Sequence, residues 1–164
     1  MTVECAWDVL SRVPDPEIPV ISVTELGIVR DVRACDGAIE VVVTPTYSGC
    51  PATEVIARSI EQALQDAGAQ AVRIEQRLAP AWTTDWIAPA AKEKLNSYGI
   101  APPHATAEPT EAVERPIVFG PRSIECPRCA SLDTERLSQF GATACKALYR
   151  CRACREPFEY FKPL

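Results

Sequence analysis

Two pairs of cysteines near the C-terminus have the spacing of metal ligands. Each pair has the form Cys-X-X-Cys, and 21 residues separate Cys126 and Cys129 from Cys151 and Cys154. Zn²⁺ takes four ligands in a tetrahedron, with thiolates at about 2.3 Å, and each Cys-X-X-Cys turn offers two. We therefore expect a structural zinc site closed by four thiolates, with no open position for catalysis. Iron in the same tetrahedron is the minor alternative, since both metals accept four thiolates.

The distribution of cysteines supports metal binding over disulfides. Five of the eight cysteines lie in the last 39 residues. The opening MTVECAWDVL lacks the basic and apolar regions of a signal peptide, and no apolar run is long enough to span a membrane. We expect a cytoplasmic protein, where a cysteine cluster is more often metal-binding than oxidised. The alternative is that these cysteines are merely buried or redox-active.

Two further residues near the expected ribbon could take part in chemistry. Cys145 is either a core residue on a strand or a spare ligand, and Lys146 and Arg150 nearby leave a reactive role open. His104 is the only histidine, and we expect it to be solvated.

Cys50 stands at a junction that favours reactivity. It follows the expected strand Ala38–Val43 and immediately precedes an expected helix, 51–67. The positive end of a helix and its unpaired N–H groups favour a thiolate, which could bind iron or act as a nucleophile. A small buried cap residue explains the same placement equally well. Asp15 and Glu17 lie on a proline-stiffened loop, where a solvated turn is the other interpretation.

These candidates must be positioned by a mixture of helices and strands, so we expect an α/β (α+β) fold. The pattern predicts a β-hairpin with Asp36-Gly37 at its turn, and Trp82 and Trp86 as core or interface anchors. The predicted elements are helix 4–12, strand Gly27–Val32, strand Ala38–Val43, helix 51–67 stopped by Gly68, strand 72–78, and a helix from Thr83 or Thr84 to Ser97 that Pro89 kinks or begins.

A change in composition divides the chain. The segment 100–116 is rich in proline, alanine and glutamate, which is typical of an extended linker. We therefore expect a first domain at 1–99, with a mixed sheet and helices, and a zinc ribbon of short antiparallel strands at 117–164. A ribbon of this size cannot fold on an apolar core alone, so the metal would supply much of its folding free energy.

The charge balance argues against a nucleic-acid partner. The net charge is −5, although residues 121–164 carry eight Lys/Arg and five Asp/Glu. Four zinc-bound thiolates would reduce the formal charge of this segment from +3 to +1, because the site itself adds −2. A basic–aromatic face remains the competing hypothesis, formed by Arg122, Arg128, Arg150, Arg152 and Arg155 with Tyr149, Tyr160 and Phe161.

Three segments, PDPEIPVISVTELGIVRDV, TPTYSGCPATEVI and APAWTTDWI, resemble the iron–sulfur cluster assembly domain family. The family's Asp-Pro-Glu loop matches Asp15, Pro16 and Glu17, and its Cys-Pro at the head of a helix matches Cys50 and Pro51. The resemblance implies that Cys50 handles iron or a cluster transiently, with Asp15 and Glu17 shaping its site.

The ribbon segment FGATACKALYRCRACREPFEYFK, joined to that domain, resembles the PaaD family of bacterial phenylacetate degradation. One departure is Ala130, where such knuckles often carry glycine. The resemblance implies a non-catalytic accessory of the multicomponent phenylacetyl-CoA epoxidase, which assists iron–sulfur cluster or iron-centre assembly. The implied partners are the di-iron oxygenase, the reductase with its flavin and [2Fe–2S] cluster, and the iron–sulfur assembly machinery.

Three other functions remain to be weighed. The chain could be a stable structural subunit of the oxygenase, or a nucleic-acid-binding ribbon. A thiol enzyme is the weakest alternative, because His104 is the only histidine that could serve Cys50 as a base. We expect no nucleic acid and no membrane among the partners, and a homodimer is a further option.

Overall fold

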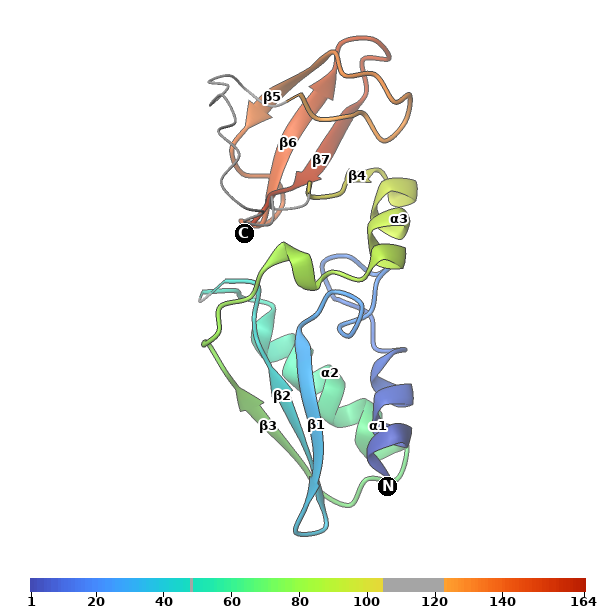
Figure 1. Ribbon diagram of the computed structural model, residues 1–164, viewed down its shortest axis with the longest axis vertical. Coiled ribbons are helices and arrows are strands. Elements are labelled where there is room, and N and C mark those ends of the chain that lie inside the picture. Colours follow the sequence, from blue (N-terminus) through green and yellow to red (C-terminus); the bar gives the residue numbers. More distant parts are fainter. Residues whose placement is uncertain (48, 105–122) are drawn as a thin grey trace, which may run out of the picture. The chain divides into compact units, whose positions relative to one another are not determined.

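The computed structural model describes residues 1–47, 49–104 and 123–164 (Figure 1). It divides into two compact units, Met1–Lys94 with Leu164, and Leu95–Pro163. This division falls five residues before the boundary expected at 99. Most of the expected linker, from residue 105 to 116, lies outside the described residues. The start of that segment, Ile100–Ala101, is a strand of the second unit, β4.

The first unit is a three-stranded mixed sheet with helices. The strand order is β1-β2-β3, with β1 antiparallel to β2 and β2 parallel to β3. The fold is therefore of the α+β class that the sequence predicts. Its elements are α1 (Val3–Leu10), β1 (Val29–Cys35), β2 (Ala38–Val43), α2 (Thr53–Asp66), β3 (Val72–Gln76), a 3₁₀ turn (Thr84–Trp86) and the start of α3 (Pro89–Tyr98).

Local signals set the two connections of this sheet. Asp36 and Gly37 both have positive φ, +50° and +77°, as a two-residue hairpin turn of type I′ requires. The predicted hairpin between β1 and β2 is confirmed. From β2 the chain returns to the parallel strand β3 through α2, and Gly68, with φ of +96°, ends that helix as predicted.

The two faces of the sheet differ in chemistry. Val32, Val41 and Ile74 lie in register across the three strands. In Figure 1, α1 and α2 run side by side along the sheet, and the buried stripe of α2 consists of Ile56, Ile60 and Leu64. Glu40 alternates with Val41 and so points away from the helices, where it pairs with Arg33.

Several element boundaries differ from the predictions: α1 ends at Leu10 rather than at residue 12, β1 ends at Cys35 rather than at Val32, and β3 ends at Gln76 rather than at residue 78. Helix α2 begins at Thr53 rather than at residue 51. Strand β1 begins at Val29, because Gly27 has a φ of +74° and cannot continue a strand. A side chain there would also collide with Trp86, whose Cβ and carbonyl oxygen both lie 2.8 Å from the position of an added Cβ. The last predicted helix begins at Pro89, which confirms one of the two predicted alternatives, because a missing N–H costs nothing at the first helical position.

The second unit is a four-stranded sheet in the order β4-β7-β6-β5. Besides β4, it holds β5 (Thr134–Ser138), β6 (Lys146–Cys151) and β7 (Pro157–Phe161). The three longer strands pair antiparallel, as a ribbon requires, whereas β4 runs parallel to β7. The buried core beneath them is small and contains two of the predicted ligands: Ala101, Ile124, Cys126, Cys151, Phe158 and Tyr160. Within the described ranges, no helix has the length and apolar character to cross a membrane.

Candidate metal centre

The two Cys-X-X-Cys segments fold into equivalent turns. The N–H of Cys126 donates to the carbonyl of Ser131, and the N–H of Cys151 donates to that of Glu156, both at 3.0 Å. The residue after the second cysteine of each turn has a left-handed backbone conformation. Its φ is +58° at Ala130 and +65° at Arg155. The same backbone conformation is thus used twice, and each turn directs two sulfurs to one side.

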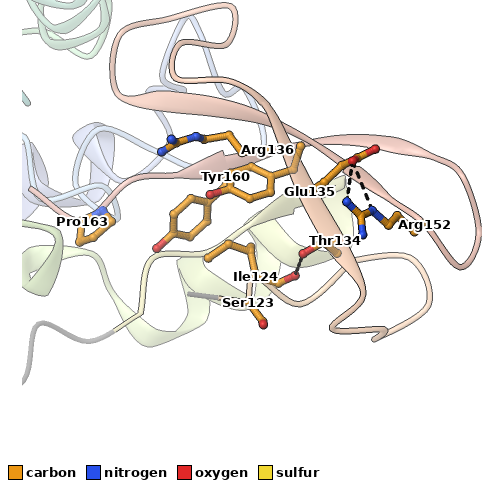
Figure 2. Close-up of a pocket in the computed structure, with 9 residues that line it drawn as sticks. Ser123, Ile124, Thr134, Glu135, Arg136, Arg152, Tyr160 and Pro163 are labelled. Atoms are coloured by element: carbon orange, nitrogen blue, oxygen red, sulfur yellow. Dashed lines mark hydrogen bonds and ion pairs between the residues drawn. The ribbon is translucent and has the colours of Figure 1, made fainter. Parts of the chain in front are cut away.

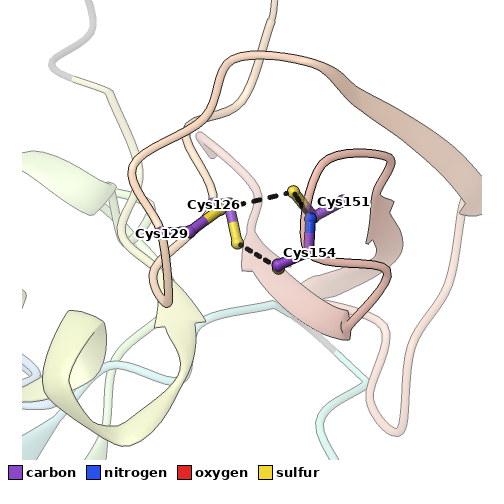
Figure 3. A group of neighbouring side chains, drawn as sticks. All are labelled: Cys126, Cys129, Cys151 and Cys154. Atoms are coloured by element: carbon purple, nitrogen blue, oxygen red, sulfur yellow. Dashed lines mark hydrogen bonds between the residues drawn. The ribbon is translucent and has the colours of Figure 1, made fainter.

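Four sulfurs converge between these turns (Figure 3). The Sγ atoms of Cys126, Cys129, Cys151 and Cys154 all lie within 4.8 Å of one another. Cys126 Sγ is 3.8 Å from Cys154 Sγ, and Cys129 Sγ is 3.6 Å from Cys151 Sγ. These separations are too long for disulfides, whose sulfurs lie about 2.05 Å apart. They match the edge of a tetrahedron with metal–sulfur bonds of about 2.3 Å, which is about 3.8 Å.

The protonation of these thiols favours a cation at the centre. The backbone N–H of Cys154, at 3.5 Å from the sulfur, lowers the pKa of Cys151 to about 7 against desolvation. The N–H of Ser131 lowers the pKa of Cys129, but desolvation and the three neighbouring sulfurs outweigh it and raise that pKa to about 12. The pKa of Cys154 is also raised. Four thiolates cannot crowd together without a positive charge, which a divalent metal supplies.

Ion pairs connect the two turns to the rest of the ribbon. Arg128, inside the first turn, pairs with Glu156 after the second turn at 2.7 Å. Glu135 on β5 accepts hydrogen bonds from both Arg150 and Arg152, and these guanidinium groups hold the pKa of Glu135 below its usual value. Sequence reasoning missed Glu135 and Glu156, and the only signal for them was opposite charge close to the cysteine turns.

These ion pairs also reduce the positive charge of the predicted basic face. Arg128, Arg150 and Arg152 each face a carboxylate, with Glu135 shared by the last two, so much of the positive charge of these three residues is balanced locally. Arg122 lies outside the described residues. Arg155 has no ion-pair partner in the described part of the chain. Within the predicted set, one arginine among the described residues is left without an ion pair, and a single arginine is a weak basis for phosphate binding.

Cys145 lies outside the sulfur cluster. It is 4 % exposed, its sulfur is 3.0 Å from the Thr143 hydroxyl, and its carbonyl accepts from the N–H of Lys162. It stands immediately before β6 as a buried residue of the sheet, which favours the core interpretation over the spare ligand. His104 packs near Tyr160, with ring centroids 6.1 Å apart.

The second predicted site is not assembled as a cluster. Among the described residues, the four cysteines above form the group of potential ligands, and Cys50, Asp15 and Glu17 do not form another. Asp15 is 4 % exposed, and its Oδ1 accepts from the N–H groups of Glu17 and Ile18. This buried carboxylate therefore stabilises the loop from within, in contrast to the solvated turn that was the alternative.

Cys50 lies in the loop before α2 and is half-buried. Its N–H donates to the carbonyl of Tyr47, and its own carbonyl accepts from the N–H and the hydroxyl of Thr53. Helix α2 begins at Thr53, and its N-cap residue is Ala52. Cys50 therefore lies further before the first residue of the helix than the sequence suggests. The turn that ends on Thr53 fixes the backbone of Cys50 and leaves its side chain outside those bonds.

Comparison with known proteins assigns both units to families. The family model of the PaaD zinc β-ribbon domain matches residues 110–162, and that of the iron–sulfur cluster assembly protein matches residues 4–75. A protein of Escherichia coli (strain K12), described as a candidate subunit of 1,2-phenylacetyl-CoA epoxidase, is 49% identical over 161 residues, which are 95% of this chain and 90% of that protein. The chain belongs to the PaaD family.

Two further proteins resemble part of this PaaD-family chain. An iron–sulfur protein maturation auxiliary factor of Porphyromonas gingivalis is 33% identical over 88 residues, covering 52% of this chain and 83% of its own. The crystal structure of a DUF59 domain from Bacillus anthracis shares the fold, with a TM-score of 0.52, 24% identity and coverage of 57% of this chain and 90% of its own.

Proposed function

We propose that the chain is a non-catalytic accessory protein of phenylacetyl-CoA epoxidation, which assists the assembly of an iron–sulfur or iron centre in the epoxidase or its reductase. One observation carries this proposal. A single chain joins a unit of the iron–sulfur assembly type to a four-sulfur ribbon, and a relative named for the epoxidase shares 95% of that chain at 49% identity. The relative's own name supports a role in the epoxidase system, and the match to the iron–sulfur cluster assembly family supports a role in assembly.

The metal in the ribbon is zinc, and it is structural. Cys126, Cys129, Cys151 and Cys154 hold it, because their sulfurs already span a tetrahedron of the right size. When bound, Zn²⁺ supplies a cross-link between the two turns and no reaction. Four thiolates fill its coordination, so neither water nor substrate reaches the ion. Metal analysis of protein purified without added metal tests this: about one zinc per chain is expected, and iron in its place would overturn the assignment.

In this proposal, Cys50 binds iron or a cluster transiently. It is half-buried on a loop whose backbone is tied to Tyr47 and Thr53. Asp15 contributes by holding its own loop closed, since Oδ1 is engaged by two N–H groups, and Glu17 is positioned by one of them. The partners are the oxygenase and reductase subunits and the iron–sulfur assembly machinery. The Porphyromonas gingivalis factor, named for maturation, supports this role for the first unit.

Complementation tests this role. In a bacterium that needs the chain to grow on phenylacetate, Cys50→Ser should fail to restore epoxidase activity, and the purified reductase should contain less iron. Cys35→Ser is the matched control, because Cys35 is an exposed cysteine of the same unit and should restore both. Full activity with Cys50→Ser would remove Cys50 from the mechanism.

A stable structural subunit is the second candidate, favoured by the word subunit in the name of the Escherichia coli relative. It predicts that the chain co-purifies with the oxygenase in a fixed ratio. An assembly factor should be absent from the finished complex. Quantitative mass spectrometry of the purified epoxidase distinguishes the two roles.

A further inference from the structure

A pocket of about 800 Å³ opens on one face of the ribbon sheet (Figure 2). Residues from all three long strands line it, among them Arg136 on β5, Tyr149 on β6 and Tyr160 on β7. Arg136 pairs in register with Tyr149, so both side chains project to the same face. In Figure 2, Arg136 and Ile124 lie on opposite sides of Tyr160. The pocket belongs to the ribbon alone and does not include the four sulfurs.

The floor of this pocket is aromatic and fixed in place. The ring of Tyr149 stacks on Phe158 with centroids 5.8 Å apart and meets Tyr160 edge to face at 5.7 Å. On the other wall, the Thr134 hydroxyl donates to the carbonyl of Ile124 at 2.7 Å. Rigid tyrosines offer a large apolar contact at low entropic cost, which is typical of surfaces that bind another chain.

The charge on the rim is unbalanced. Arg152 and Glu135 line the pocket together and pair through a hydrogen bond of 2.9 Å, and Glu135 also accepts from Arg150, which does not line the pocket. Arg136 faces no carboxylate in the described ranges, and it donates instead to the side-chain oxygen of Gln139, at 2.7 Å. That bond uses one of five guanidinium N–H groups, and the remaining donors suit a carboxylate. The pocket therefore carries one uncompensated positive charge beside an apolar floor.

The position of β5 favours an extended ligand. It is an edge strand of the sheet, so among the residues that the structure describes one side of its backbone has no strand partner. A chain lying along an edge strand directs alternate side chains to one face. The irregularity in pairing between Arg136 and Ser138 limits such contact to the first half of β5, next to the pocket.

We propose that this pocket docks an extended acidic segment of the partner protein, with one carboxylate on Arg136 and an apolar side chain two positions away against Tyr149. The inference rests on the proposed function only in naming the partner as a protein of the epoxidase system. A polyanion such as RNA fits less well, because Glu135 stands on the same rim. A second copy of this chain is the competing occupant, and the experiment below separates the two.

The test uses the zinc-loaded full chain and two fluorescein-labelled heptapeptides, SESFSES, in which the glutamates and the phenylalanine share one face of an extended chain, and its uncharged counterpart SQSFSQS. Fluorescence anisotropy should show tighter binding of the acidic peptide by about tenfold at low salt, with the difference shrinking as ionic strength rises. Arg136→Glu should abolish that preference. Arg73→Glu is the matched control, since Arg73 is an exposed arginine of β3 in the first unit and the net charge changes equally.

The apolar half of the site is tested by Tyr149→Ala. It should weaken both peptides at least fivefold, and the absorption spectrum of the cobalt-substituted variant reports whether the ribbon is still folded. If that spectrum is lost, Tyr149→Leu, which keeps apolar volume in the core, replaces it and should still weaken both peptides.

Two results would overturn the proposal. The first is equal binding of the two peptides, or an unchanged preference in Arg136→Glu. The second is a wild-type dimer in sedimentation that Arg136→Glu converts to monomer, which would assign the pocket to a second copy. Binding here needs no epoxidase activity, so full complementation by Cys50→Ser together with intact peptide binding would reject the role proposed for Cys50 and leave the docking site standing.

Discussion

Replacing Cys129 with serine removes one sulfur from the cluster while leaving the core of the ribbon intact. Cys129 is exposed, whereas Cys126 and Cys151 are buried among the core residues of the same unit. A loss of metal binding in Cys129→Ser therefore reports ligation and not packing. The matched control is Cys145→Ser, because Cys145 is a fifth cysteine of the ribbon that lies outside the cluster.

The expected effect is large. Structural zinc sites in small domains contribute roughly 10–16 kcal/mol, so the loss of one ligand in four should weaken zinc binding by roughly a hundredfold. Cys145→Ser should change zinc affinity by less than about threefold, since no metal–sulfur bond is lost. Competition with a chelator of known affinity measures both changes.

The pH dependence of wild-type binding follows from the thiol pKa values. Zinc binds thiolates, so every thiol that is protonated beforehand must release its proton. Near pH 7, Cys129, with its pKa raised to about 12, and Cys154, with a raised pKa, each release a full proton, and Cys151, with a pKa of about 7, releases about half of one. Zinc affinity should fall by at least about 300-fold per unit as the pH drops below 7.

Calorimetry in buffers of different ionisation enthalpy counts the released protons directly. The cobalt-substituted protein gives an independent check, because four thiolates produce an intense charge-transfer band that Cys129→Ser should weaken. Fewer than two protons released near pH 7, or zinc binding in Cys129→Ser as tight as in Cys145→Ser, would refute the four-sulfur site.

Three further predictions concern stability. Gly27→Ala should destabilise the first unit by about 2 kcal/mol more than Gly68→Ala in thermal unfolding. Both positions have positive φ, but only at Gly27 would the added Cβ lie 2.8 Å from the Trp86 carbonyl oxygen. Equal effects of the two substitutions would exclude the collision. Ala130→Gly should stabilise the zinc-loaded ribbon by about 0.5–1 kcal/mol by relieving a φ of +58°, and a loss of stability in denaturant titration would contradict this. Glu159→Leu should lower the free energy of unfolding by about 2–3 kcal/mol, because the buried ammonium of Lys146, 3 % exposed and 2.6 Å from Glu159, loses its partner. Adding Lys146→Met should recover most of that loss. A double variant as unstable as the single one would refute this account.

The metal centre could be predicted closely because its signal is local. A Cys-X-X-Cys turn positions two sulfurs by itself, and the hairpin between the two turns needs only strand-forming residues and a loop. The spacing therefore predicted the four residues that the structure brings within 4.8 Å. The hairpin at Asp36-Gly37 was predictable for the same reason, since a type I′ turn depends on two residues alone.

The surroundings of Cys50 were predicted less well. The sequence shows a proline and a helical stripe after it, which suggested a helix starting at residue 51. Helix α2 instead begins at Thr53, because a turn closed by the Thr53 N–H and hydroxyl on the Cys50 carbonyl precedes it. Helix ends depend on such individual hydrogen bonds, and periodicity does not specify them.

By itself, the sequence determined which residues can ligate a metal, where the chain turns, and which helices and strands form, because each of these depends on neighbours a few positions away. Only the tertiary structure decided what those elements meet. The Trp82 indole donates to the carbonyl of Leu26, 56 positions away, and the aromatic pocket of the ribbon forms where β5, β6 and β7 come into register. Such contacts are set by the packing of whole elements, which brings together residues that no local pattern links.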